Sequence, residues 1–245
     1  MAPQIVLITG ASRGIGAETA VQLADRDRHI VVNYREKARR ATATVDAVRA
    51  AGGDASAMQA DLTDERAVVA MLEAVRQRFG RLDVLVLNAS GGLESGAGPG
   101  YAMRINRDAQ VGLARLALPL MKPLGRIVFV TSHQAHFSWR DPVPAGYEPI
   151  AASKRAGEDD LRGLRQTFEA HGVTFVVVSG DMVDGTAVVR QFERSNPDAV
   201  AARRAVAPLP TVSEFAGAIA RAAVGPEPDG ETIYVGGQDY LRQGS

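Results

Sequence analysis

The chain alternates between two patterns of apolar positions. Short runs of consecutive apolar, often β-branched, residues are typical of strands buried on both faces. Such runs occur at residues 4–10, 29–34, 55–61, 82–89, 125–132, 173–178 and 232–237. The segments between them carry apolar residues at helical spacing, which predicts helices over 15–27, 37–51, 64–79, 102–121, 149–170, 184–194 and 211–224. Asp64 and Gly80 are expected to cap the third helix.

Strands that alternate with helices predict right-handed crossovers and a parallel sheet covered by helices on both faces. No linker rich in proline, glycine or serine and no internal repeat divides the chain. We therefore expect an α/β fold, a single doubly wound domain over residues 1–245 with about seven strands. The two least regular segments, 90–101 and 133–148, follow the carboxyl ends of predicted strands, where ligands bind in such sheets.

Composition narrows the classes of function. The formal net charge is zero, which argues against binding to nucleic acid or to an anionic membrane as the main role. The absence of cysteine excludes disulfides and thiolate chemistry, and the four histidines lack the spacing of metal ligands. No apolar run is long enough to predict a membrane span, and the first residues do not resemble a signal peptide. We expect a cytoplasmic protein.

A glycine-rich turn links the first predicted strand to the first helix. The stretch "TGASRGIG" (9–16) places glycines at positions 10, 14 and 16. Glycine allows the tight turn and lets a pyrophosphate approach the amino end of the helix. A turn without a ligand is the alternative, but this position in a strand–turn–helix unit favours nucleotide binding.

The spacing Thr-Gly-x-x-x-Gly-x-Gly resembles the signature of the short-chain dehydrogenase/reductase family, whose members have a Rossmann fold. Further motifs follow in the family's order: "ADLTD" (60–64), Asn88 with Ala89, Asn106, Ser132 and "AASKRAG" (151–157). In this resemblance the Asp61 side chain contacts an adenine ring, and Asn106 supports a proton relay. It implies a cofactor site built from Gly10, Ser12, Arg13, Gly14, Ile15, Gly16, Arg35, Asp61, Leu62, Asn88, Ala89, Ser90 and Lys154.

Charge near the second strand indicates which cofactor is bound. A carboxylate at the end of that strand would bind the ribose 2′-hydroxyl of NAD. Here the sequence is Asn33-Tyr34-Arg35, with Arg13 in the glycine loop. Guanidinium groups form charge-assisted, bidentate hydrogen bonds with phosphate, so these residues favour the 2′-phosphate of NADP(H). The alternative for Arg35 is a solvated residue at the start of a helix.

The proton donor departs from the family's usual pattern. Most members carry a tyrosine four residues before the lysine, so that both lie on one helix face. That position is Ile150 here, and the nearby tyrosine is Tyr147, seven residues before Lys154. The Tyr-x6-Lys spacing resembles enoyl-acyl-carrier-protein reductases, as does the Ser179-Gly180 pair. Pro149 is expected to begin the helix, which places Tyr147 in the loop that enters it.

The sequence therefore predicts an NADP(H)-dependent reductase of an enoyl or carbonyl substrate, with Ser132, Tyr147, Lys154 and Asn106 as catalytic residues. His133 and His136 are alternative proton donors. Two other functions stay open: a nucleotide-binding protein without redox turnover, and a non-redox dehydratase or isomerase. The resemblance also implies a homo-oligomer, a tetramer or dimer, with helices 102–121 and 149–170 at its interfaces. Residues 141–149 ("DPVPAGYEP"), Phe137 and Trp139 are expected to line an apolar substrate pocket.

Overall fold

A seven-stranded sheet forms the centre of the molecule in the computed structural model, which describes residues 2–93, 98 and 100–242. Every pair of neighbouring strands is parallel, in the order β3-β2-β1-β4-β5-β6-β7. The strands are β1 (Gln4–Ile8), β2 (Arg28–Tyr34), β3 (Asp54–Gln59), β4 (Leu82–Leu87), β5 (Met121–Ser132), β6 (Thr174–Gly180) and β7 (Thr232–Val235). The predicted α/β class and doubly wound parallel sheet are confirmed.

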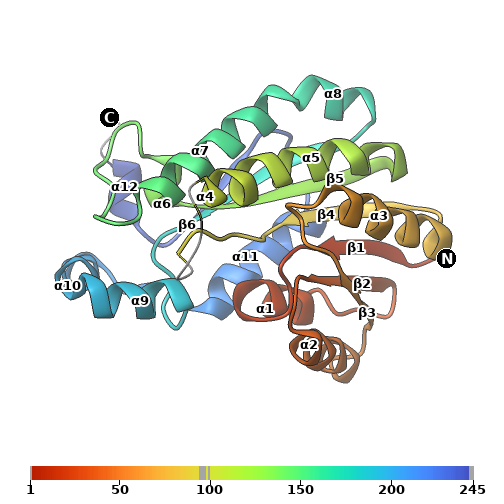
Figure 1. Cartoon of the computed structure of the whole chain (residues 1–245), viewed down its shortest axis with the longest axis horizontal. Coiled ribbons are helices and arrows are strands. Elements are labelled where there is room, and N and C mark those ends of the chain that lie inside the picture. The colour runs from red at the N-terminus through yellow and green to blue at the C-terminus, as the bar shows by residue number, and fades with distance from the viewer. Residues whose placement is uncertain (1, 94–97, 99, 243–245) are drawn as a thin grey trace.

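Helices cover both faces of this sheet (Figure 1). The first face carries α3 (Glu65–Phe79), α5 (Ala109–Ala117), α7 (Glu148–Gly163) and α8 (Arg165–Ala170). The second carries α1 (Gly14–Gln22), α2 (Ala38–Ala50) and α11 (Val212–Val224). Near the carboxyl ends of the strands lie α4 (Tyr101–Met103), α6 (His133–His136), α9 (Ala187–Ser195), α10 (Pro197–Val206) and α12 (Gln238–Arg242).

Side chains of β1 alternate between two apolar cores. Ile5 and Leu7 pack under the first group of helices, whereas Val6 and Ile8 pack under the second. All four are at most 2% exposed. Successive side chains of a strand point to opposite faces, so a strand buried on both faces needs a continuous apolar run. The uninterrupted apolar stretch in the sequence follows directly from this double burial.

Helix α3, the third predicted helix, begins after Asp64 and ends before Gly80, the two capping residues expected from the sequence. Asp64 accepts hydrogen bonds from the backbone N–H groups of Arg66 and Ala67 at the start of α3. Gly80 ends the helix with φ of 68°, a left-handed conformation that glycine adopts without steric cost. Both signals are local to the chain, which is why the predicted boundaries of this helix were accurate.

The helix predicted over 102–121 is divided into four segments. Short α4 leads into a π-helical turn, η1 (Arg104–Asp108), followed by α5 and by a 3₁₀ turn, η2 (Leu118–Leu120). The side chain of Gln110 donates to the Ile105 carbonyl oxygen at 2.8 Å and to the Ala89 carbonyl oxygen at 2.9 Å. The π turn thus depends on contacts with the chain after β4, which helical periodicity does not reveal.

Helix α7 packs closely against this π turn at Gly157. A Cβ atom at position 157 would lie 2.4 Å from the backbone oxygen of Asn106. We expect Gly157→Ala to lower the free energy of unfolding by roughly 1–3 kcal/mol, because one of the two helices must move. Urea denaturation measures this change.

Gly112 provides the matched control for that substitution. It is also helical, in α5, and a Cβ atom there meets nothing within 4 Å. Gly112→Ala should leave stability unchanged or raise it by up to about 1 kcal/mol, since alanine is the better helix former. Equal effects of the two substitutions would contradict the close approach of α7 to η1.

Several parts of the second half of the chain differ from the sequence prediction. The helix predicted over 149–170 is interrupted at Leu164, between α7 and α8. Residues 133–136 form the short helix α6 within the segment expected to be irregular, and α10 and α12 were not predicted. The signal for α10 was present, since Asn196 caps it and Pro197 occupies its first turn. Of the irregular segment 90–101, residues 94–97 and 99 lie outside the described residues. Across the described part of the chain, none of the helices is both long and apolar enough to cross a membrane.

Candidate active site

The glycine loop lies at the carboxyl end of β1, where the chain turns into α1. Gly10 and Gly14 have φ angles of 62° and 57°, which strain any side-chain-bearing residue. A Cβ atom at Gly16 would lie 2.5 Å from Asn88 Nδ2 and 2.9 Å from the Gly10 oxygen. Arg13 makes no side-chain cap at the start of α1, so the first N–H groups of the helix stay available to an anion.

Buried polar side chains hold this loop against the neighbouring strands. Thr9 Oγ1 accepts from the backbone N–H groups of Asn88 at 2.9 Å and Ala89 at 3.0 Å. Asn88 Nδ2 donates in turn to the Thr9 oxygen at 2.8 Å. Asn33, 2% exposed, accepts from Gly10 N and donates to the Ala60 oxygen. The loop is therefore fixed before any ligand binds.

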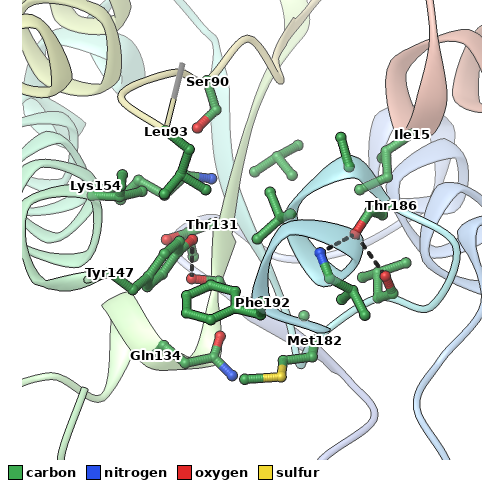
Figure 2. A pocket seen from close by; sticks show the side chains of 18 of the residues that line it. Ile15, Ser90, Leu93, Thr131, Gln134, Tyr147, Lys154, Met182, Thr186 and Phe192 are labelled. Atoms are coloured by element: carbon green, nitrogen blue, oxygen red, sulfur yellow. Dashed lines mark hydrogen bonds between the residues drawn. The ribbon is translucent and has the colours of Figure 1, made fainter. Parts of the chain in front are cut away.

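A cleft of about 280 Å³ extends from the glycine loop to the start of α7. Its lining includes Arg13, Ile15, Asn88, Ser90, Ser132, Tyr147 and Lys154. In Figure 2, Ser90 lies on the same side as Lys154 and Tyr147, and Ile15 lies on the opposite side. Thr131 also lines it, and its Oγ1 is buried without a hydrogen-bond partner among the described residues. A buried hydroxyl without a partner is costly, so this atom is suited to contact a bound ligand. The preformed loop, the free helix end and this hydroxyl fit a dinucleotide.

Tyr147 occupies the N-cap position of α7 and projects into this cleft. The backbone N–H groups of Ile150 and Ala151 donate to its carbonyl oxygen at 3.0 and 2.9 Å, so its backbone joins the first turn of the helix. The Tyr147 hydroxyl lies 3.3 Å from Ser132 Oγ. Burial raises the pKa of the phenol, and the contact with Ser132 offsets part of this rise. The phenol is therefore protonated at neutral pH.

Lys154 lies on the same face of α7, two turns after Tyr147, and both side chains point into the cleft (Figure 2). Removal of water from its surroundings lowers the pKa of the ammonium group to about 8. Ile150, 3% exposed, stands between the two residues along the helix and packs in an apolar cluster with Tyr147 and Phe192. The family's usual tyrosine position is thus an apolar wall of the cleft.

Asn106 uses its whole side chain to hold the backbone beside the cleft. Its Oδ1 accepts from Gly91 N at 3.1 Å, and its Nδ2 donates to the Gly91 oxygen and to Ser153 Oγ. Asn106 is 1% exposed and Ser153, the neighbour of Lys154, is fully buried. The side chain ties the segment after β4 to α7, one residue from the lysine.

The residues predicted to bind the adenosine half lie outside the lining of this cleft. Arg35 follows β2, and its guanidinium donates to Tyr101 Oη at 2.5 Å and pairs with Glu36 at 3.0 Å. Asp61 Oδ1 accepts from the backbone and hydroxyl of Thr63, and Leu62 packs in the core at 6% exposure. Ser12 is partly buried in the glycine loop. Their roles stay predictions.

Neither histidine after Ser132 lines the cleft. His133 Nε2 lies 3.2 Å from the Gly236 carbonyl oxygen, which can only accept, so Nδ1 accepts from Ser179 Oγ at 2.8 Å. Burial lowers the pKa of His133, in keeping with a neutral ring. His136 contacts the buried Glu158 carboxylate at 2.8 Å and Tyr234 Oη at 3.1 Å. The geometry does not support the alternative that a histidine replaces the missing donor.

Two aromatic residues expected in the substrate pocket lie elsewhere. Phe137 stacks on Tyr234 and Tyr240 and is covered by Arg140, behind the short helix α6. Trp139 is 70% exposed. The expectation assumed an irregular loop, and it was wrong because the chain forms helix α6, which turns these side chains away from the cleft. From the segment 141–149, Pro144 and Tyr147 do line the cleft.

Much of the lining of the cleft comes from residues that the sequence did not indicate. They are Leu93, Gln134, Met182, Val183, Thr186, Val189, Gln191 and Phe192. The amphipathic spacing of Val189 and Phe192 predicts a buried face for α9, and it was the only available signal. That α9 lines the same cleft as the ends of β5 and β6 depends on the tertiary structure.

Comparison with known proteins gives one family. The family model described as short chain dehydrogenase matches residues 4–197. A 1-cyclohexenylcarbonyl-CoA reductase of Streptomyces collinus is 37% identical over 189 residues, which cover 74% of this chain and 65% of that protein. A hydroxynaphthalene reductase of Aspergillus fumigatus is 34% identical over 177 residues, 70% of this chain and 63% of that protein. The matches thus span less than two thirds of both relatives.

Solved structures agree over nearly the whole chain. A short chain dehydrogenase from Burkholderia cenocepacia in complex with NADP is 30% identical, with a TM-score of 0.79 and coverage of 95% of this chain and 96% of that one. The promiscuous reductase LugOII, which catalyses keto-reduction at C1 during lugdunomycin biosynthesis, is 25% identical with a TM-score of 0.81, covering 96% and 98%. With the family model, the glycine loop and the lysine of α7 in agreement, the chain belongs to the short-chain dehydrogenase/reductase family of oxidoreductases.

Proposed function

We propose that the protein is an NADP(H)-dependent reductase that uses Tyr147 as its proton donor. One observation carries the proposal: the Tyr147 hydroxyl lies 3.3 Å from Ser132 Oγ in the cleft that also contains Lys154 and the glycine loop. A substrate carbonyl oxygen placed between the two hydroxyls would accept a hydrogen bond from each. Tyr147 thereby takes the place of a tyrosine at position 150.

The bound cofactor supplies a hydride to the substrate. When the acceptor is a ketone carbon, the oxygen gains a negative charge and takes the Tyr147 proton. When it is the β-carbon of an enoyl thioester, hydride addition gives an enolate whose oxygen takes the Tyr147 proton, with Ser132 as a second hydrogen-bond donor, and the enol then tautomerises in water to the saturated thioester. In both cases the Lys154 ammonium stabilises negative charge near the phenol.

Binding of NADP(H) rather than NAD(H) is favoured by charge. Arg13 lies exposed in the glycine loop, and Arg35 follows β2, whose last two residues, Asn33 and Tyr34, carry no carboxylate. A 2′-phosphate would compete for Arg35 with Glu36 and the Tyr101 hydroxyl. The NADP-bound structure from Burkholderia cenocepacia supports the same cofactor, although an NAD-bound member also shares the fold.

A reductase screen tests the function. Purified protein is mixed with NADPH or NADH and with enoyl thioesters, cyclic ketones and quinones, and oxidation of the cofactor is followed by absorbance. We expect turnover with NADPH for at least one carbonyl class. Binding of NADPH with no turnover of any class would instead favour the nucleotide-binding alternative, for which the apolar Ile150 is the specific observation.

Cofactor affinity is expected to fall at high pH. Lys154 has a folded-state pKa of about 8, so its positive charge is present below that pH and lost above it. The Kd for NADPH should increase by up to about tenfold per pH unit above 8, the limit for one proton. Calorimetric titrations between pH 7 and 9.5 measure this dependence.

Lys154→Met provides the reference for that experiment. The variant should bind NADPH weakly with no pH dependence in this range. In the cofactor-free protein the sign for stability is opposite: the unfolded chain holds the Lys154 proton up to pH 10.5, so stability rises with pH between 8 and 10.5. An unchanged pH dependence of NADPH binding in Lys154→Met would assign it to another group.

A further inference from the structure

Gln134 places an amide in the wall of the cleft, two residues after Ser132. It lies on α6, lines the cleft and is 6% exposed. Its Nε2 donates to Asp181 Oδ1 at 3.3 Å and contacts Tyr240 Oη at 3.5 Å. The side chain is thus held from behind by residues at the end of β6 and on α12.

The partners of Asp181 fix which end of the amide faces the cleft. Asp181 Oδ2 accepts from Arg203 Nε at 2.6 Å, and Oδ1 accepts from Met182 N at 2.8 Å. A carboxylate only accepts hydrogen bonds, so the amide nitrogen of Gln134 must face it. The amide oxygen then points toward the side of Tyr147 and Phe192 (Figure 2).

Among the described residues, no N–H or O–H group donates a hydrogen bond to this oxygen. The oxygen keeps some exposure to the cleft, because it is not one of the fully buried polar atoms without a partner. The lining of the cleft is mainly apolar and includes Pro144, Met182 and Phe192. A ligand that fills the cleft removes water from the oxygen. Unless the ligand supplies a donor, an acceptor is left unpaired, which weakens binding.

We propose that Gln134 Oε1 accepts a hydrogen bond from a hydroxyl group of the substrate, and that the protein acts on apolar carbonyl compounds bearing such a hydroxyl. The inference that the substrate carries a carbonyl group rests on the proposed reductase function, whereas the inference that it carries a hydroxyl group rests on Gln134. An ether of the same size, or a carboxylate, offers only acceptors and is disfavoured at this position.

Matched tetralones test the proposal. α-Tetralones with a phenolic hydroxyl at each ring position in turn are compared with the methoxy counterparts and the parent ketone. Binding to NADP⁺-loaded protein is measured by calorimetry, and NADPH-dependent reduction by kcat/KM. We expect one hydroxyl isomer to bind roughly threefold to tenfold more tightly than its methoxy counterpart, the value of one net hydrogen bond.

Two variants assign that preference to a residue. Gln134→Met keeps the length of the side chain but removes the acceptor, and it should abolish the hydroxyl preference. Gln191→Met alters the other glutamine of the lining, which donates to the Leu93 oxygen at 3.4 Å, and it should retain the preference. Tm values of both variants check folding.

This experiment tests the role of Gln134 and the reductase function separately. Equal binding of hydroxyl and methoxy compounds, no binding by any of them, or a preference retained in Gln134→Met overturns the role of Gln134. Reduction without hydroxyl preference would leave the reductase proposal intact. Hydroxyl-dependent binding without any reduction would keep the Gln134 assignment and overturn the reductase function.

Discussion

Tyr147→Phe is expected to lower kcat/KM for carbonyl reduction by roughly 10²- to 10⁴-fold, the usual contribution of a positioned general acid. The substitution removes only the hydroxyl that lies 3.3 Å from Ser132 Oγ, and it keeps the ring that packs against Phe192 at 5.7 Å. Stability and NADPH affinity should therefore change little. Steady-state kinetics with the best substrate of the reductase screen measures the loss.

Tyr234→Phe is the matched control for this substitution. The Tyr234 hydroxyl contacts His136 and lies outside the lining of the cleft, so activity should persist. A second variant tests position: Tyr147→Phe combined with Ile150→Tyr puts the donor at the family's usual spacing from Lys154, and ketone reduction should return in part. Full activity in Tyr147→Phe alone would show that Tyr147 is not the donor.

Arg203→Leu is expected to lower the free energy of unfolding by roughly 3–5 kcal/mol, because it leaves a buried carboxylate without its counter-charge. Arg203 on α10 is 9% exposed and the Asp181 side chain 0% exposed, and their contact is 2.6 Å. Arg203 also binds Asp239 of α12 through two hydrogen bonds, at 2.6 and 2.8 Å. Urea denaturation measures the loss.

A surface pair provides the comparison. Arg76 and Glu73 make a contact of similar length, 2.7 Å, but their side chains are 63% and 42% exposed. Arg76→Leu should destabilise the protein far less than Arg203→Leu, because solvent screens an exposed ion pair. Adding Asp181→Asn to Arg203→Leu should recover part of the stability, since the buried charge is removed and an acceptor for Met182 N remains. A loss in Arg203→Leu no larger than in Arg76→Leu would contradict this account.

The parts of the fold that depend on local signals could be predicted from the sequence. Helix α3 has its capping aspartate and its terminal glycine within the chain segment itself, and β1 shows its double burial as an apolar run. The π turn η1 could not be predicted, because it depends on hydrogen bonds to the segment after β4 and on the approach of Gly157. The same holds for α12, which Arg203 holds from another helix.

The candidate site likewise contains residues that local motifs predict and residues that only the tertiary structure places. The glycine loop, Ser132 and Lys154 belong to motifs of adjacent residues, and the structure brings them to one cleft. Phe137 was assigned to the pocket from its place in the chain, but a single helical turn at α6 directs it to Tyr234 and Tyr240. Gln134, on the same turn, faces the cleft instead, and nothing in its local sequence distinguishes it from its neighbours.

The contacts that hold α12 in place affect where the protein can be attached to a surface or to a fusion partner. Asp239 ties α12 to Arg203, and the Tyr240 hydroxyl contacts Gln134, so α12 is joined to the wall of the cleft. Strand β1 begins at Gln4, on the side of the molecule opposite α12, where the amino ends of the parallel strands lie (Figure 1). For immobilisation or fusion, we therefore expect a linker before β1 to leave the cleft undisturbed, whereas a bulky partner after α12 would strain the ion pair between Arg203 and Asp239.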